Sequence, residues 1–263
     1  MSVPAPAAPG RWWGRWIGRF VAHVLWRTDV RGLQHLGDGP VLLAVNHVSV
    51  LDGPLVYSCN RRGVHFLVKK EMFRGFFGWV LHQVGQIPVD RSGSDRAALS
   101  AAVAVLREGG AAGIFPEGSR GRGDVAAVRT GIAWIALQSG APVVPVAVLG
   151  TRRTGERAGG LPRLRRRLHV VHGEPFRLVR PAGVPGKQAL AGAAEQVRIR
   201  LVDHVAASVA LTGVTLPDDP GTDPRATATA APGTTAAPRA PAPPTTTAPT
   251  GTDQSTGQAG GAA

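Results

Sequence analysis

Cysteine is almost absent from this chain of 263 residues. Cys59 is the only one, so no disulfide can form within the chain. A single thiol fits a reducing compartment. Zinc sites need clustered Cys and His residues at short, regular spacings, and no such spacing occurs. The sequence therefore predicts neither a disulfide framework nor a metal site.

Lysine is also scarce, at positions 69, 70 and 187 only, yet the net charge is +13. A composition that favours arginine would explain the choice of Arg over Lys, but not the excess of bases over acids. Such an excess indicates an anionic partner. Nucleic acid, an anionic membrane surface and a phosphorylated substrate are the three classes that fit.

The N-terminal segment lacks the uninterrupted apolar run of a transmembrane helix. Arg19 and Arg27 leave only seven uncharged positions between them, against the roughly 20 residues that a span needs. No small-residue cleavage site follows, so the segment is not typical of a signal peptide. It does carry a helical apolar stripe over residues 11–27, formed by Trp13, Trp16, Ile17, Phe20, Val21 and Val24. Tryptophan beside arginine favours a helix lying in a membrane interface. The alternative is an amphipathic helix docked on its own domain.

Large apolar residues are missing from the C-terminal region. From about Leu216 the chain is rich in Thr, Ala, Pro and Gly, a composition that cannot bury enough apolar area to order itself. We therefore predict three parts. Residues 1–35 form an N-terminal segment with the interfacial helix, residues 36–212 form one domain, and residues 213–263 form a disordered tail.

Strand and helix patterns alternate along the predicted domain. Short apolar runs at 41–45, 65–69, 111–116 and 141–150 indicate buried strands, and helical patterns cover 95–109, 128–140 and 187–210. This order predicts a single α/β domain with a largely parallel central sheet flanked by helices. The aromatic segment 72–85 fits either the core or a second membrane contact.

Candidate functional residues follow the predicted strands, where open α/β sheets bind ligands. His47 and Asp52 come after the first run, within "NHVSVLD". A histidine held by a carboxylate is suited to act as a general base. Ser49 and Asp52 also match a capping box, in which Asp52 would only satisfy backbone amides at a helix start. The motif alone leaves both interpretations open.

The motif is one of four ordered blocks along the chain: "NHVSVLD", "GQIPVDR", "FPEGSR" and "VPVAV". With these blocks, residues 40–150 resemble the glycerolipid acyltransferases, and among them the 1-acylglycerol-3-phosphate (lysophosphatidic acid) acyltransferases. The first and third blocks, about 65 residues apart, carry most of the resemblance. The third block has Ser119 where the family commonly has threonine. The run "RLRRR" (163–167) matches no family motif and is either a membrane-facing or a solvated loop.

The resemblance implies a role for each matching residue. His47 would be the base and Asp52 its partner, without a serine or cysteine nucleophile. Guanidinium groups suit phosphate, and Lys70 is a looser candidate for the same phosphate. The substrate-binding residues implied in this way are Arg91, Glu117, Gly118, Ser119, Arg120 and Lys70.

The predicted function is transfer of a fatty acyl group to the sn-2 hydroxyl of 1-acylglycerol-3-phosphate. Acyl-CoA or acyl-carrier protein would be the donor, and no bound cofactor is implied. The partners would be that donor, the lysophospholipid acceptor and an anionic membrane, with peripheral (monotopic) attachment at the cytoplasmic face of the cell membrane. Another lysolipid acceptor is an alternative. A non-catalytic basic protein that binds lipid or nucleic acid is a second, but charge binding alone needs no carboxylates at strand ends, so no nucleic acid is expected.

Overall fold

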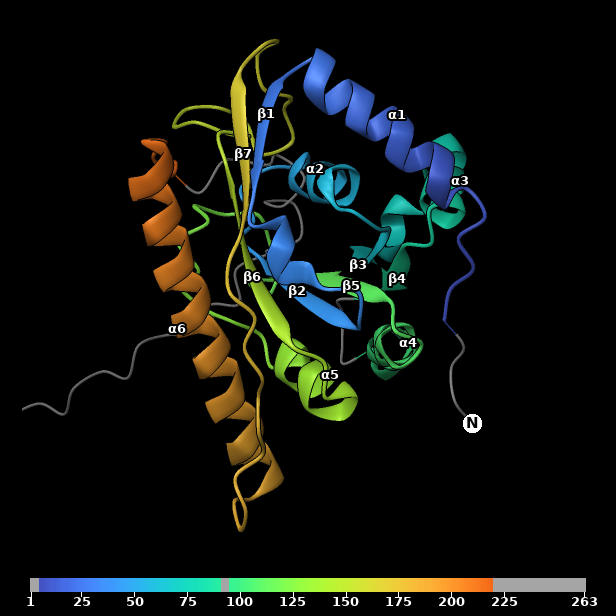
Figure 1. Cartoon of the computed structure of the whole chain (residues 1–263), viewed down its shortest axis with the longest axis vertical. Coiled ribbons are helices and arrows are strands. Elements are labelled where there is room, and N and C mark those ends of the chain that lie inside the picture. Colours follow the sequence, from blue (N-terminus) through green and yellow to red (C-terminus); the bar gives the residue numbers. More distant parts are fainter. Residues whose placement is uncertain (1–4, 91–94, 220–263) are drawn as a thin grey trace, which may run out of the picture.

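The computed structural model describes residues 5–90 and 95–219, which form a sheet of seven strands between two layers of helices (Figure 1). The strands are β1 (Arg27–Arg31), β2 (Val41–Val45), β3 (Val64–Lys69), β4 (Ile87–Val89), β5 (Ala111–Ile114), β6 (Val143–Leu149) and β7 (Arg167–His172). The helices are α1 (Arg11–Val24), α2 (Asp52–Cys59), α3 (Gly75–Gln83), α4 (Arg96–Arg107), α5 (Gly131–Ser139) and α6 (Gly186–Thr212), with 3₁₀ helices at Leu33–Leu36 and Lys70–Met72.

The sheet has the strand order β1-β7-β6-β2-β5-β3-β4. Every neighbouring pair is parallel except β6 and β7, which run antiparallel. The predicted α/β fold with a largely parallel sheet is therefore confirmed.

Strand β2 lies near the middle of the sheet and is buried on both sides, which explains its continuous apolar sequence. Leu42 and Ala44 pack with α4, α5 and α6 on one face. The intervening side chains pack with α1 and α2 on the other face; they are Val41, Leu43 and Val45. One strand thus joins two cores, and its C-terminal end is held rigidly.

Helix α1 docks on α2 through small residues and not through its aromatic stripe. A Cβ atom at Gly18 would lie 2.1 Å from Ser58 Oγ, and one at Gly14 would lie 2.7 Å from Val84 Cγ1. The opposite face is open, with Trp16 72% and Phe20 67% exposed. Helix α1 is thus docked on its own domain, where Val21 of the predicted stripe packs against the core, while Trp16 and Phe20 of the same stripe face outward. Across residues 5–90 and 95–219, the helices lack the combination of length and apolarity that crossing a bilayer requires.

Helix α3 lies within the aromatic segment 72–85, and most of its aromatic residues are exposed and not buried in the core. Phe76 is 78% exposed, and its ring stacks on Trp79 with centroids 5.8 Å apart. Trp79 also stacks with Trp13 of α1 at 6.2 Å. The aromatic surfaces of α1 and α3 are therefore continuous.

The sheet and core extend into both predicted flanking segments. Strand β1, inside the predicted N-terminal segment (1–35), pairs with β7 at the edge of the sheet. Leu216, inside the predicted tail (213–263), packs against the core, and Asp219 forms an ion pair with Arg152. Residues 220–263 lie outside the described residues.

Candidate active site

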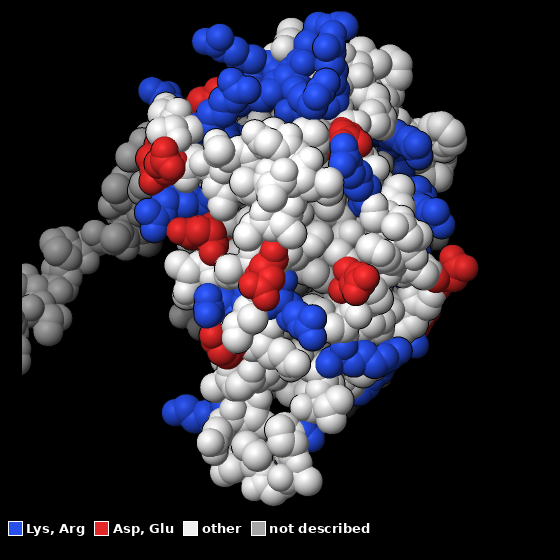
Figure 2. Space-filling model, turned by 60° about the vertical axis from the view of Figure 1, so that its left-hand side comes forward, with Lys and Arg blue, Asp and Glu red and all other residues white. Residues whose placement is uncertain are grey.

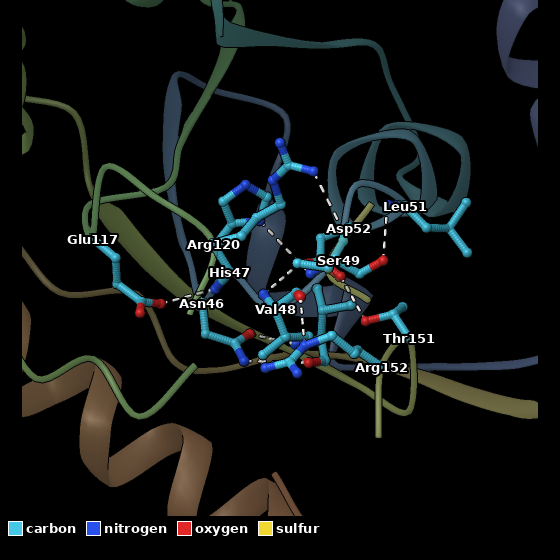
Figure 3. Close-up of polar contacts among 12 residues, drawn as sticks. Asn46, His47, Val48, Ser49, Leu51, Asp52, Glu117, Arg120, Thr151 and Arg152 are labelled. Atoms are coloured by element: carbon cyan, nitrogen blue, oxygen red, sulfur yellow. Dashed lines mark hydrogen bonds and ion pairs between the residues drawn. The ribbon is translucent and has the colours of Figure 1, made fainter. Parts of the chain in front are cut away.

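Three parallel strands bring the candidate residues to one edge of the sheet. His47 follows β2, Lys69 ends β3, and residues 115–120 follow β5, which pairs with both of those strands. Because the carboxyl ends of parallel strands meet at the same edge, sequence segments far apart in the chain converge there. Figure 3 shows His47, Glu117 and Arg120 around this point.

His47 and Asp52 form a buried pair. Nδ1 of His47 lies 3.0 Å from Oδ2 of Asp52, whose side chain is fully buried. The same carboxylate oxygen accepts the backbone N–H groups of Val48 and Ser49, each at 2.8 Å, and Oδ1 accepts the hydroxyl of Thr151 at 2.6 Å (Figure 3). Asp52 thus satisfies loop amides at the start of α2, as in a capping box, and also holds the imidazole.

The pair determines which ring nitrogen of His47 can take up a proton. A carboxylate only accepts hydrogen bonds, so Nδ1 carries the hydrogen and Nε2 the lone pair. Phe115 stacks on the imidazole with centroids 4.0 Å apart, and the His47 side chain is 11% exposed. The ring is therefore fixed in orientation by a carboxylate and an aromatic face, which is the arrangement that general-base catalysis needs.

Glu117 supports the backbone of the histidine loop. Its Oε1 accepts the N–H of His47 at 2.8 Å, and the N–H of Gly121 donates to the carbonyl of His47 at 2.9 Å. Burial raises the pKa of Glu117 to about 7, with smaller contributions in the same direction from Asp124 and Asp52; the His47 amide opposes them. The carboxylate predicted to bind substrate thus also orders the loop that carries His47.

A cavity of about 140 Å³ opens beside the imidazole, and His47, Lys69 and Arg120 all line it. Nη1 of Arg120 lies 3.5 Å from the carbonyl oxygen of Ala158. The remaining wall is largely apolar, with Leu67, Val68, Met72, Phe77, Leu81 and Phe115. Cationic and apolar surfaces therefore meet at the histidine, as an anionic lipid would require.

The other predicted binding residues lie at different distances from this cavity. Lys70 is exposed and pairs with Asp90, so it is Lys69 that lines the wall beside His47. Ser119 is exposed at the surface of the loop after β5. Arg91 lies outside the described residues.

A second cavity, of about 500 Å³, shares Leu67 and Phe115 with the first and is also lined by Gly118 and Arg129. Gly118 has φ +75°, and a Cβ atom there would lie 2.2 Å from Nε of Arg129. Both the backbone conformation and the packing of Arg129 therefore require glycine at this position.

Three residues that buttress the site were not predicted from the sequence. Asn46 donates to the carbonyl of Val148 and accepts its N–H, which ties the histidine loop to β6. The hydroxyl of Thr151 donates to Asp52. The buried guanidinium of Arg152 donates from Nε to the carbonyl of Val48 at 3.0 Å and from Nη2 to the carbonyl of Gly121 at 2.9 Å. Asn46 adjoins His47 in the sequence, but Thr151 and Arg152 follow the last strand block with no signal of their own.

No group of three or more His, Cys, Asp or Glu side chains in the described ranges is arranged to hold a metal ion.

Comparisons with known proteins find relatives both in sequence and in structure. The sequence profile of the Acyltransferase family matches residues 27–149. The chain is 31% identical over 141 residues to 1-acyl-sn-glycerol-3-phosphate acyltransferase of Bacillus subtilis (strain 168), covering 52% of this chain and 67% of that protein. It is 36% identical over 120 residues to the protein of the same name from Borreliella burgdorferi, covering 42% and 46% of the two chains.

The fold also has a solved counterpart. The crystal structure of the 1-acyl-sn-glycerophosphate (LPA) acyltransferase PlsC from Thermotoga maritima matches with a TM-score of 0.54 at 22% identity, over 73% of this chain and 78% of that one. At this identity the match supports the fold alone. The sequence comparisons lead to one conclusion: this chain belongs to the acyltransferase family and is an enzyme of that family.

Proposed function

We propose that this acyltransferase moves a fatty acyl group from acyl-CoA or acyl-carrier protein to the sn-2 hydroxyl of 1-acylglycerol-3-phosphate, forming phosphatidic acid for phospholipid synthesis. The observation that carries the proposal is the pair of His47 with the fully buried Asp52 beside a cavity that is part cationic and part apolar. The names of the relatives indicate the same acceptor.

The chemistry follows from the tautomer of His47. Nε2 takes the proton from the acceptor hydroxyl as its oxygen attacks the thioester carbonyl carbon. Asp52 stabilises the imidazolium that forms. When the tetrahedral intermediate collapses, the C–S bond breaks, and the imidazolium returns the proton to the leaving thiolate. No acyl-enzyme intermediate is needed.

The acceptor phosphate would bind the cationic wall of the cavity. Arg120 and Lys69 both line it, and an arginine can bind phosphate through two hydrogen bonds. We keep Arg91, Lys70, Glu117, Gly118 and Ser119 as candidate binding residues. The apolar wall suits an acyl chain, since burying apolar surface stabilises the complex in proportion to its area.

Peripheral attachment to the cytoplasmic face of the cell membrane is part of the proposal. The outward aromatic face of α1 and the exposed rings of α3 supply apolar surface. Arg19 lies on the exposed side of α1, and basic residues next to aromatic ones suit an interface of lipid headgroups. Such attachment would bring the cavity to its lipid substrate.

An acyl-transfer assay tests the function. Purified protein is given each donor in turn, with lysophosphatidic acid and with lysolipids of larger or uncharged headgroup in detergent. Preferred use of lysophosphatidic acid, and a loss of roughly 10²–10⁴-fold in His47→Ala, are expected. Preference for another lysolipid would change the acceptor but keep the chemistry. Activity of His47→Ala within a few-fold of the parent protein would contradict the proposal.

A further inference from the structure

Residues 161–167, named here the basic loop, comprise the loop before β7 and the first residue of that strand, and they display both leucine and arginine to solvent. Leu161 and Leu164 are each 70% exposed. Arg163, Arg165 and Arg167 are exposed between and after them. The two exposed leucines, interleaved with arginines, give this loop apolar and cationic surface side by side.

The basic loop is held firmly against the rest of the protein. Nε1 of Trp26 donates to the carbonyl of Pro162 at 3.1 Å. The backbone N–H of Arg165 donates to the carbonyl of Leu25 at 2.6 Å. The backbone N–H of Arg27 donates to the carbonyl of Arg166 at 2.9 Å. These bonds join the loop to the end of α1 and the start of β1. The exposed leucines and arginines therefore project from a fixed base beside the outward face of α1.

Positive charge dominates this end of the molecule. Residues 151–167 hold seven arginines and a single acid, Glu156, which pairs with Arg166 at 2.5 Å. Within the described ranges, Arg163, Arg165 and Arg167 have no ion pair with a carboxylate. Figure 2 shows Lys and Arg side chains gathered at the top of the molecule, the end at which β1 and β7 begin in Figure 1.

The conformation of Arg165 also favours display of its side chain. Its φ is +60°, in the left-handed region that glycine adopts more readily. An arginine at such a position costs some stability relative to glycine, and in return it places a charged side chain at the tip of the turn. A loop that served only to connect two elements would gain from glycine here.

We propose that the basic loop binds the surface of an anionic phospholipid membrane, with Leu161 and Leu164 entering the interface and the arginines contacting lipid phosphates. Lipid is favoured over nucleic acid because the exposed leucines match an apolar layer beneath the phosphates. The loop also continues the outward face of α1, where Phe20 and Val24 are exposed. The inference rests on the proposed function only in its choice of a lipid surface.

The loop also connects this surface to the candidate active site. Ala158, three residues before Leu161, accepts the N–H of Val50 at 3.0 Å and lies beside Arg120. Binding at the basic loop would thus place the histidine cavity next to the membrane surface.

Vesicle co-sedimentation of the full chain tests the proposal. The variant Arg163→Gln/Arg165→Gln/Arg167→Gln is compared with Arg96→Gln/Arg180→Gln/Lys187→Gln, which removes the same charge from exposed sites on α4 and near the start of α6. Each basic residue near an anionic surface contributes about five-fold, so the first variant should bind phosphatidylglycerol–phosphatidylcholine vesicles about 100-fold more weakly. The second should bind within a few-fold of the parent.

Two further arms separate the explanations. Leu161→Ser/Leu164→Ser should weaken vesicle binding even at high salt, where pure charge attraction is screened. The rate of acyl transfer to detergent-dispersed lysophosphatidic acid should stay within about two-fold of the parent rate in all these variants, because none of them alters the cavity. Failure of the proposed function would instead appear as absent activity in the parent protein. Equal vesicle binding by the two triple variants would overturn the proposal. The proposal would also be overturned if the basic-loop triple variant bound a random DNA duplex more weakly than the parent but bound vesicles equally well.

Discussion

At the scale of single residues, Asp52 is held by contacts to both oxygens of its side chain. Its two carboxylate oxygens take part in four contacts, with the His47 ring, two loop amides and the Thr151 hydroxyl. Burying a carboxylate is costly unless each oxygen is hydrogen-bonded, and here each one is. Its role as a support of the loop and its proposed role as partner of the base are therefore compatible.

The substitution Asp52→Asn separates these roles. Asparagine still offers an oxygen to the loop amides, but it cannot stabilise an imidazolium as a carboxylate does. We expect kcat to fall by roughly 10²–10⁴-fold, with little change in Tm. Steady-state kinetics and thermal unfolding of the same preparation measure both. A large fall in Tm with kcat retained would leave Asp52 only a structural role.

Glu117 predicts a pH dependence of stability. Its pKa is about 7 in the folded chain against an ordinary 4.5, chiefly because of burial. Between these values the unfolded chain has released a proton that the folded chain keeps, so stability falls as pH rises from 4.5 to 7. Above pH 7 the loss of folding stability stays constant at about 3 kcal/mol, since one pKa unit corresponds to about 1.4 kcal/mol.

Glu117→Gln should remove this dependence, because glutamine keeps an acceptor for the His47 amide but has no charge. We expect its Tm to exceed that of the parent by roughly 5–10 °C at pH 8, and by much less at pH 5. Calorimetry at the two pH values checks this. An equal difference between the two proteins at both pH values would show that ionisation of Glu117 does not control stability.

At the scale of elements, α1 has two faces with separate purposes. Trp12, Trp16 and Phe20 face outward, whereas Gly18 packs against Ser58 of α2. Trp12→Ser/Trp16→Ser/Phe20→Ser should lower vesicle binding by roughly 10- to 100-fold, because less apolar surface is buried, with Tm unchanged. Gly18→Leu should lower Tm and leave vesicle binding by the folded protein unchanged, since a leucine cannot fit between α1 and α2. Flotation assays and thermal unfolding distinguish them, and a large Tm loss in the aromatic variant would mean that the stripe packs on protein.

At the scale of the whole molecule, the C-terminal segment reaches back to the site. Asp219 pairs with the buried guanidinium of Arg152 at 2.6 Å, and Arg152 holds the carbonyls of Val48 and Gly121. Asp219→Ala should lower Tm and kcat more than Asp218→Ala. Among the described residues, the Asp218 carboxylate has one long contact, of 3.5 Å, with Thr154. A buried charge that loses its partner is strongly destabilising. Equal Tm and kcat values for the two variants would show that Arg152 does not need the carboxylate of Asp219.

Much of the fold followed from sequence periodicity. The apolar runs predicted β2, β3, β5 and β6, and the helical patterns predicted α4, α5 and α6, because these elements are long or buried on both faces. Strands β1, β4 and β7 were not predicted; β7 begins at Arg167, the last residue of the arginine run that was expected to form a loop. Strands β1 and β4 lie at the two edges of the sheet. The sequence "RTDVR" of β1 lacks an apolar run, and β4 has only three residues. Such edge strands form because a neighbouring strand offers hydrogen bonds, which local sequence does not record.

The sequence by itself determined which residue types the protein offers: its motif blocks predict His47, Asp52, Glu117 and Arg120 as site residues, and these residue types suit base catalysis and phosphate binding. Tertiary structure decided which groups meet. It placed Lys69, and not Lys70, beside His47, brought Thr151 to Asp52 across 99 positions, and turned the aromatic face of α1 outward. The physical reason is that side-chain chemistry is local, whereas neighbours across a parallel sheet depend on strand order and on how each helix packs.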